Sequence, residues 1–268
     1  MISKEKKEKM IQTQLEFPTL LTDFDSKIES FKNREVKAKT IFKLMKIDKS
    51  VAYQFISQYH YLKDAKFFSK FSYGLFLDDV LVGCSTFSNP QGTVTLKGWF
   101  GLENDNQDVL ELGRLCMLPK LNGTNATSYL LGNSLKLLKN EGVKAVITLA
   151  DDSRHVGSIY QVCNFKYYGL TDKKSDFYTS DGKVNPRGTT KEKRGVWIPR
   201  TQKHRYCYIL DETLVCLFQE QPKPTLGMIN HYDCCNQTGK VFDNRFKEWY
   251  TCPKCTGTIS PISLDEVY

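Results

Sequence analysis

The sequence contains no long hydrophobic run. No apolar segment approaches the length of about 18 residues that a membrane-spanning helix requires, so we expect no membrane association. The first ten residues, MISKEKKEKM, also lack the apolar stretch and the cleavage site of a signal peptide. Without such a signal, the nine cysteines favour a reducing compartment, where cysteines are free or bind metal rather than form disulfides. We therefore predict a cytoplasmic protein.

The overall composition narrows the class of protein further. The 268 residues suffice for one large domain with an appendage or for two small domains, and a hydrophobic share of 40% excludes wholesale disorder. The formal net charge of +8 favours a polyanionic partner, such as nucleic acid, an anionic membrane or a phosphate-bearing cofactor. Solubility alone is the alternative explanation of this charge.

The spacing of apolar residues and turn formers predicts a definite order of elements. We expect one or two lysine-rich helices up to about residue 46, and a helix that begins at Asp48 or Ser50. Strands should follow at 71–88 (a hairpin that turns at Asp78-Asp79), 92–100, 109–118, 143–150, 166–170 and 203–210. Two further helices are expected at 126–142, ended by Gly142, and at 155–165. Residues 172–200 are polar and basic, which predicts a long loop.

This order of elements resembles the layout of an acetyltransferase-like α+β domain of the GNAT superfamily. The resemblance implies a mixed, mostly antiparallel central sheet flanked by helices. It also implies that two neighbouring strands splay apart, so that a phosphate-bearing cofactor enters the gap and lies on the start of the next helix. We divide the chain into a basic helical extension (1–47), a GNAT-like catalytic domain (48–215) and a small C-terminal module (216–268).

A polar loop separates the strand at 109–118 from the helix that begins near Ala126. The first N–H groups of that helix and its dipole make an anion site, so Asn125, Thr127 and Ser128 are candidates for binding a phosphate or carboxylate. The loop lacks the glycine-rich QxxGxG pattern of coenzyme A sites. Either the loop is a variant, with acetyl-CoA as donor, or the donor is another molecule. An ordinary helix N-cap at Thr127 or Ser128 is the simpler alternative.

Arg114 lies inside the same strand, among apolar residues. A buried guanidinium needs an acceptor, because an unpaired buried charge is costly. Strict alternation would place Leu112, Arg114 and Cys116 on one face of the strand. Arg114 would then bind an anionic group of the donor or substrate. The alternatives are a solvent-facing edge position and a buried ion pair with an acid such as Asp151.

The segment LADDSRHVGSIYQVCNF holds a second group of candidates. Asp151 follows a buried strand and is a candidate base or amine anchor, because ligands gather at strand ends in such sheets. Asp152 is an alternative N-cap, and His155 can donate to an anion. Tyr160 is a candidate general acid, with core packing as the alternative. His60, at the end of an aromatic-rich helix, is a weaker candidate.

The C-terminal segment carries two pairs of potential zinc ligands. His231-x2-Cys234 and Cys252-x2-Cys255 have the spacing of two zinc knuckles joined by a hairpin, and Cys235 is a surplus or alternative ligand. A module this small cannot fold on its core alone, so structural zinc would explain its stability. Free buried cysteines are the alternative. The sequence therefore predicts a zinc-ribbon-like module.

Several segments together resemble the Mom family of phage Mu and related phages, from about residue 50 to residue 211. They are YHYLK, ELGRLCM, YLLGNSLKLLK, LADDSRHVGSIYQVCNFKYYG and KHRYCYILD. The resemblance implies a GNAT-like enzyme that converts adenine N6 in phage DNA to a carbamoylmethyl (acetamido) adduct, which blocks host restriction enzymes. It implies functional roles for His60, Arg114, Ser128, Asp151 and Tyr160. The partner would be double-stranded DNA with the adenine flipped out, in the cytoplasm of a bacterial host.

Two other functions remain open from the sequence. A conventional N-acetyltransferase would use acetyl-CoA on a protein, tRNA or small amine. A non-catalytic phage protein would bind nucleic acid only. Because a carbamoylmethyl group forms an N–CH2 bond and not an N–C=O bond, simple acyl transfer does not produce it. The donor is therefore unidentified, and an additional metal or a radical step stays open, as does the oligomeric state.

Overall fold

The chain folds into two compact units. The computed structural model describes residues 18–61, 67–90, 95–103, 108–152, 155–179, 184–185, 195–199, 201–224, 240–243, 248–251 and 261–262. The first unit comprises Met1–Leu149, Ile159–Thr171 and His204–Gln221, and the second comprises Ala150–Ser158, Asp172–Lys203 and Pro222–Tyr268. No helix in the described part of the chain is long and apolar enough to cross a membrane.

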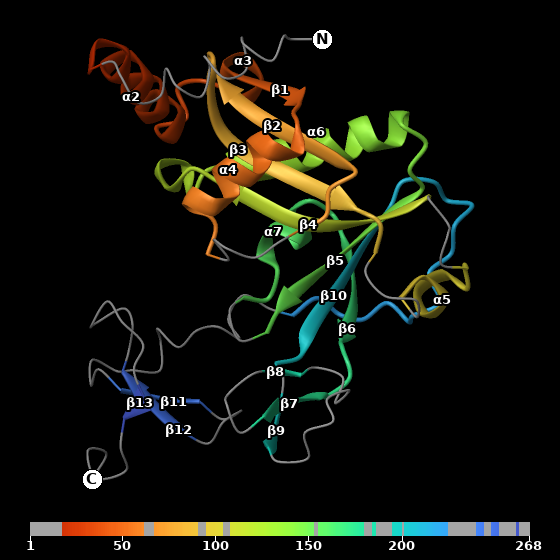
Figure 1. Cartoon of the computed structure of the whole chain (residues 1–268). Helices are drawn as coiled ribbons and strands as arrows, with labels where there is room; N and C mark the ends of the chain where they lie inside the picture. The colour runs from red at the N-terminus through yellow and green to blue at the C-terminus, as the bar shows by residue number, and fades with distance from the viewer. Residues whose placement is uncertain are drawn as a thin grey trace. The chain divides into compact units, whose positions relative to one another are not determined.

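A seven-stranded sheet with the order β1-β2-β3-β4-β5-β10-β6 organises the fold (Figure 1). The strands are β1 Phe42–Lys46, β2 Phe71–Leu77, β3 Val80–Ser88, β4 Val109–Met117, β5 Ala145–Asp151, β6 Lys166–Leu170 and β10 Lys203–Ile209. Strands β1 to β4 pair antiparallel in sequence, β10 pairs antiparallel with β6, and β4 pairs parallel with β5. The mixed, mostly antiparallel sheet that the sequence predicted is therefore confirmed.

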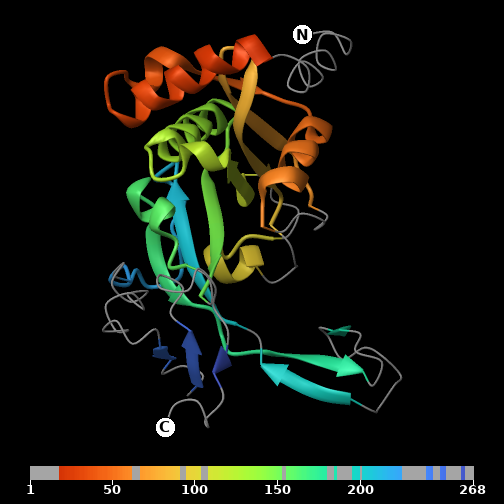
Figure 2. The same cartoon turned by 90° about the vertical axis from the view of Figure 1, so that its left-hand side faces the viewer.

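Helices cover both faces of β2 and β3. The helices of this half are α2 Pro18–Lys32, α4 Lys49–Tyr59 and α6 Ala126–Asn140. Leu75 packs with residues of α2 and α6, whereas the next residue, Phe76, packs with residues of α4. Because successive side chains of a strand point to opposite faces, α6 and α4 lie on opposite sides of the sheet. Figure 2 shows the strands between these helices.

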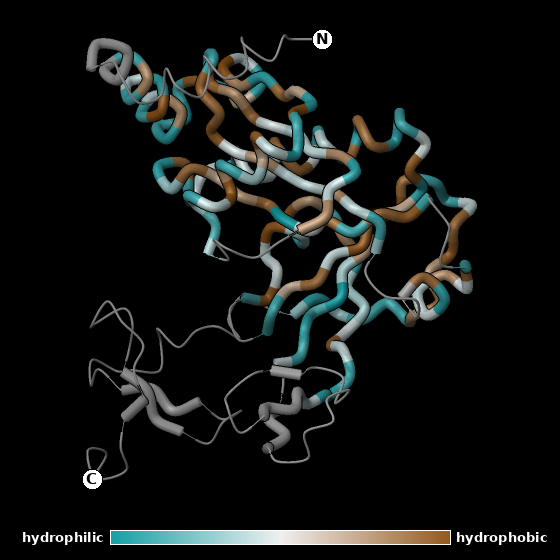
Figure 3. The backbone as a smooth tube through the Cα atoms, in the orientation of Figure 1, coloured by the Kyte–Doolittle hydropathy of each residue, from teal (hydrophilic) through white to brown (hydrophobic). Residues whose placement is uncertain are grey.

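The N-terminal part of the sheet contains a strand that the sequence analysis missed. Helices were expected up to about residue 46, but β1 pairs with β2 from Phe42 opposite Leu77 to Lys46 opposite Tyr73. The short run FKLMK becomes a strand because its backbone groups complete the ladder of β2. Helix α2 is amphipathic, as its alternating colours in Figure 3 show, and it buries Ile28 and Phe31 in the core.

The segment before β4 is a helix and not the strand that alternation predicted. Helix α5 (Thr95–Phe100) buries Leu96, Trp99 and Phe100 against Val109, Ile147 and other residues of β4, β5 and β10. Leu96, Trp99 and Phe100 have the i, i+3, i+4 spacing of a helical face. The apolar residues of this short run fit both a helical and an alternating spacing. Packing against the sheet therefore decided in favour of the helix.

The second unit contains two small antiparallel sheets. Strands β7 (Ser175–Thr179), β8 (Val184–Asn185) and β9 (Gly195–Pro199) form one, in the order β8-β7-β9. The prediction of a long loop over 172–200 is wrong for these residues, because each pairs with a neighbouring strand. The other sheet has the order β11-β12-β13, from Lys240–Asp243, Glu248–Thr251 and Pro261–Ile262.

Candidate functional site

A β-bulge in β4 determines where its side chains point. Thr86 of β3 pairs with Arg114, but Phe87, the next residue, pairs with Leu112, so Gly113 is the extra residue. Thr86 and Phe87 face opposite sides, and so do their partners Arg114 and Leu112. The prediction that Leu112 and Arg114 share a face is therefore wrong, because strict alternation does not survive an inserted residue.

The ladder between β4 and β5 is short. Their pairing runs only from Val109 opposite Ala145 to Glu111 opposite Ile147. Beyond it, the Thr148 hydroxyl donates a hydrogen bond to the carbonyl oxygen of Leu112 at 3.3 Å, so a side chain replaces the ladder bond. The resemblance to GNAT domains implied a splay between neighbouring strands, and among the described strands none pairs with β4 on this side beyond Glu111.

Arg114 carries an unsatisfied donor within the first unit. Its Nη1 donates to the carbonyl oxygen of Gly113 at 2.7 Å, and its guanidinium carbon lies 5.8 Å from the centre of the Phe67 ring. Its Nε is buried and has no hydrogen-bond partner, and the same is true of the Oγ1 atom of Thr86, directly opposite. None of the ion pairs among the described residues involves Arg114. The two orphaned groups favour a ligand, because a buried unsatisfied donor costs about 1–3 kcal/mol.

Tyr160 is a buried phenol that keeps its proton. It lies in α7 (Ser158–Val162), is 8% exposed, and packs against Phe165 and Tyr206 with ring centres 5.7 and 5.4 Å away. Burial raises its pKa above the ordinary value of 10.0, although a hydrogen bond with Thr148 opposes this shift. Tyr160 is therefore a neutral hydrogen-bond donor at physiological pH, connected through Thr148 to the splayed strand β4.

Tyr61 connects His60 with Tyr160. It ends α4, where its backbone N–H donates to Ile56 at 2.8 Å, and its ring is 8% exposed. The His60 ring stacks on Tyr61 with centres 4.3 Å apart, and Tyr61 is near enough to Tyr160 to contribute to the rise of its pKa. The structure therefore gathers His60 and Tyr160 in one region of the first unit.

The start of α6 differs from the prediction in its capping. The helix begins at Ala126 as expected, but Thr127 and Ser128 are not its N-cap. Asn125 holds that position without a side-chain bond, and the Thr124 hydroxyl oxygen accepts from the Ala126 N–H at 3.2 Å. Ser128 Oγ donates to Asn125 and Thr124 Oγ1 to Leu121, so both hydroxyl hydrogens are already used. An anion here would depend on the backbone N–H groups of Thr127 and Ser128, not on the hydroxyl hydrogens of Thr124 and Ser128.

Asp151 belongs to the second unit. It is the last residue of β5 and half-buried, and its carbonyl oxygen accepts from the His155 N–H at 3.0 Å. The Nδ1 atom of His155 accepts a hydrogen bond from the Gly157 N–H at 3.1 Å, and the Asp152 N–H donates to Gln202 at 3.1 Å. Asp151 thus lies on a local turn that holds its backbone in place, while His60, Arg114, Ser128 and Tyr160 belong to the first unit.

The predicted zinc ligands fall outside the described residues. This applies to His231, Cys234, Cys235, Cys252 and Cys255. Elsewhere in the described part of the chain, no group of three or more His, Cys, Asp and Glu residues could hold a metal ion. The five described cysteines are free thiols: Cys84, Cys116, Cys163, Cys207 and Cys216.

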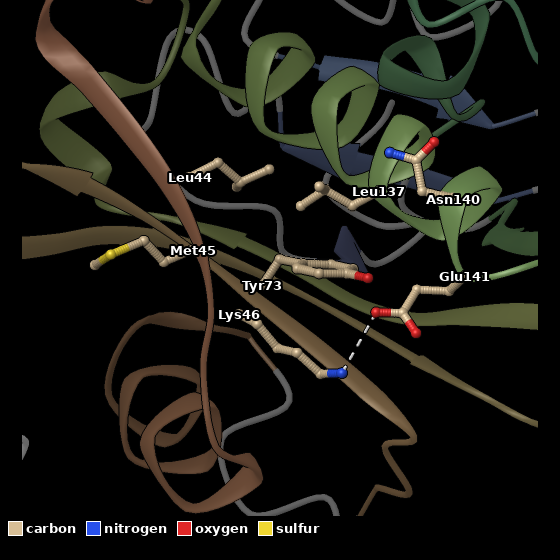
Figure 4. A pocket seen from close by; sticks show the side chains of 7 residues that line it. All are labelled: Leu44, Met45, Lys46, Tyr73, Leu137, Asn140 and Glu141. Carbon is tan, nitrogen blue, oxygen red and sulfur yellow. Dashed lines mark ion pairs between the residues drawn. The ribbon is translucent and has the colours of Figure 1, made fainter. Parts of the chain in front are cut away.

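A separate pocket of about 300 Å³ lies at the other end of α6, lined by residues of β1, β2 and α6 (Figure 4). Tyr73 forms one wall, and its buried hydroxyl has no hydrogen-bond partner. Burial, with a contribution from Glu141, raises the pKa of Tyr73 to about 12. Lys46 and Glu141 pair at 3.6 Å. None of the predicted site residues lines this pocket.

Four residues of the site region were not singled out from the sequence. They are Tyr61, Phe67, Thr86 and Thr148. Their importance depends on tertiary neighbours that no local pattern reveals. One signal was present, because a glycine inside an apolar strand often marks a bulge, and Gly113 is such a glycine.

The family of the protein follows from a comparison with family models. The model of the Mom protein family matches residues 41–225, which is more than half of the chain. The chain belongs to the Mom protein family. The match begins with β1 and ends beyond β10, so it spans the whole seven-stranded sheet. A search of curated proteins finds no match.

Solved acetyltransferases show a distant likeness. The ribosomal-protein-S18-alanine N-acetyltransferase from Escherichia coli is 10% identical, with a TM-score of 0.41, over 64% of this chain and 95% of that chain. The IAA acetyltransferase from Bacillus cereus is 13% identical, with a TM-score of 0.39, over 63% and 99%. A GNAT family acetyltransferase from Elizabethkingia anophelis, solved with acetyl-CoA bound, is 14% identical, with a TM-score of 0.35, over 63% and 97%. Nothing about substrate follows from likenesses this distant.

Proposed function

We propose that this member of the Mom family is a transferase that modifies the exocyclic N6 of adenine in DNA to a carbamoylmethyl (acetamido) adduct, which protects the DNA from host restriction. The observation that carries the proposal is the family match over residues 41–225. A buried proton donor and an orphaned guanidinium N–H in the first unit give it chemical support.

The reaction requires a new bond between N6 and a methylene carbon. The N6 lone pair is delocalised into the ring, so the base must leave the duplex and approach the donor carbon closely. When N6 displaces the leaving group, the N–CH2 bond forms, the bond to the leaving group breaks with its electron pair, and N6 loses one proton. In our proposal Tyr160 supplies a proton to the leaving group, and the proton of N6 passes to water.

Arg114 would hold an acceptor atom of the donor or substrate. Its Nε and the Thr86 hydroxyl lack partners, and both lie on the α4 face of the sheet. An oxygen placed between them would satisfy both groups at once. Such fixed donors stabilise charge that develops during a reaction, because they need no reorientation at that moment.

The donor binds, in this proposal, along the splayed part of β4. Any phosphate groups of the donor would lie at the backbone N–H groups at the start of α6, beside the part of β4 beyond Glu111. The loop before α6 offers little else to its phosphates, because Lys120 already pairs with Asp25 at 2.8 Å. A donor with less negative charge than coenzyme A therefore fits these residues better.

Mass spectrometry of nucleosides from DNA of cells that express the chain tests this function. We expect carbamoylmethyl-adenine, and none in cells that express Tyr160→Phe. Unmodified adenine, together with acetyl-CoA consumption on an added amine, would instead establish a conventional acetyltransferase. Unmodified adenine with tight DNA binding and no acetyl transfer would establish a non-catalytic binding protein.

We also propose structural zinc in the C-terminal segment, on His231, Cys252 and Cys255 with Cys234 or Cys235. The spacing of these ligands is the basis. It is supported by the β11–β12 hairpin, after whose second strand Cys252 follows directly. Elemental analysis should find about one zinc per chain in freshly purified protein. A Cys252→Ser variant that retains full zinc would contradict the assignment.

A further inference from the structure

Exposed aromatic rings gather around α4 and the start of β2. Three of the eight most exposed large hydrophobic residues in the described chain are aromatic, and all three belong to this region: Tyr53 at 41%, Tyr61 at 54% and Phe68 at 67%. Each keeps 41% or more of its surface exposed, although α4 buries Phe55 and Ile56 in the core. Large hydrophobic side chains that are exposed together often mark an interaction surface.

The buried Phe67 ring packs beneath this surface. It is 8% exposed and stacks on Tyr53, with ring centres 6.0 Å apart and an angle of 26° between the rings. Arg114 lies 5.8 Å from the centre of the same Phe67 ring. The exposed rings are therefore continuous, through Phe67, with the orphaned guanidinium of the candidate site.

A cation accompanies the rings. The Nζ atom of Lys49 lies 5.9 Å from the centre of the Phe67 ring and 5.8 Å from that of Phe68. Rings beside a cation suit a ligand with flat faces and negative charges, and single-stranded nucleic acid has both.

We propose that Lys49, Tyr53 and Phe68, supported by Phe67, form a stacking surface for unpaired DNA bases beside the adenine that is modified. The inference rests on the proposed function for its choice of DNA. Flipping an adenine out of a duplex leaves neighbouring bases unstacked, and aromatic rings next to Arg114 would receive them. The surface would thus hold the opened DNA while the reaction proceeds.

Binding of a fluorescent oligothymidylate of about 12 nucleotides tests the surface without any need for adenine chemistry. We expect Tyr53→Ala and Phe68→Ala each to weaken binding about tenfold, because stacked rings contribute this much per base. Tyr53→Phe, which keeps the ring, should bind like the parent. So should Val215→Ala, whose side chain is as exposed as that of Phe68. Lys49→Gln should lower the slope of log affinity against log salt by about 0.7.

The outcomes separate this inference from the proposed function. If the alanine variants bind the oligonucleotide as tightly as the parent does, the surface proposal is wrong, even where modified adenine is formed. If binding depends on the rings but no modified adenine appears, the surface stands and the proposed function fails. If the alanine variants change only the oligomeric state of the protein in solution, and not its affinity for the oligonucleotide, the rings bind a second copy of the chain. The proposal is then overturned.

Discussion

The two faces of the β3–β4 pair differ in whether their buried polar groups have hydrogen-bond partners. On the α6 face, Ser85 lies 2.9 Å from Ser134, whose hydroxyl also bonds to the Leu130 carbonyl oxygen at 2.8 Å. On the α4 face, the next residue, Thr86, and its partner Arg114 each bury a polar atom that has no partner. The same two strands therefore carry one satisfied face and one unsatisfied face.

In our proposal this difference separates a face that stabilises the fold from a face that binds a ligand. Buried polar groups in folded proteins are nearly always paired, so exceptions point to function. The apolar clusters on both faces are well buried, and within the β3–β4 pair the unpaired polar groups lie on the α4 face, whereas the unpaired hydroxyl of the α6 face belongs to Tyr73 of β2. Variants of matched residues on the two faces test whether the unpaired groups serve a ligand.

The largest expected effect is that of Tyr160→Phe. Removal of the phenol hydroxyl should lower the rate of base modification by about 10²–10⁴-fold, the usual contribution of a general acid, and leave the fold intact. Because burial raises the pKa of Tyr160, its proton should be retained as the pH increases through 10.0, the ordinary value. A rate that declines well below that pH in the parent, but not in the variant, would contradict the raised pKa, and a parental rate in the variant would contradict the role as general acid. Rates from single-turnover experiments over a range of pH provide the check.

Arg114→Lys should lower the rate by about 10²-fold. Lysine retains the charge but has no equivalent of Nε, and it cannot present the planar fork of arginine. Lys120→Arg, which keeps the ion pair with Asp25 on the surface, is the matched control and should leave the rate unchanged. Full activity of Arg114→Lys would mean that only charge matters at this position.

Leu130→Ala tests the α6 face through stability. Leu130 is fully buried in the cluster with Leu75 and Val82. Its truncation should lower the free energy of unfolding by about 2–5 kcal/mol, because it leaves a cavity. The rate of modification per folded molecule should not change. Urea denaturation, with activity normalised to the folded fraction, measures both quantities.

Thr86→Val and Ser85→Ala should change stability in opposite directions. Thr86→Val removes a buried hydroxyl that has no partner, so the free energy of unfolding should rise by about 1 kcal/mol. Ser85→Ala leaves Ser134 with one bond fewer and should lower it by about 1 kcal/mol. A loss of stability in Thr86→Val would show that the hydroxyl is satisfied in solution, and the contrast between the faces would disappear.

Much of this architecture could be predicted from the sequence. Strand β4, the polar loop and helix α6 follow from clear periodicity, and Gly142 ends α6 with a φ of +83°, as its position indicated. Strand β1 and helix α5 could not be predicted. Each is a short run whose local pattern is ambiguous, and each is decided by a partner distant in sequence.

The candidate site could be predicted only in part from the sequence, for the same reason. Residue type and position singled out Arg114 and Tyr160. The bulge at Gly113 and the hydrogen bond from Thr148 to Leu112 arise from strand pairing, which spacing along one strand does not encode. The orphaned Nε of Arg114 could not be inferred either, because whether a buried donor finds an acceptor depends on the whole fold.

The most direct test measures modified adenine in Arg114→Lys and Ser85→Ala side by side. Each variant is expressed to the same level of folded protein, and nucleosides from the host DNA are quantified by mass spectrometry. We predict parental amounts of carbamoylmethyl-adenine with Ser85→Ala and about one hundredth of that amount with Arg114→Lys. Equal amounts with both variants, or none with the parent chain, would contradict the claim that the α4 face holds the substrate.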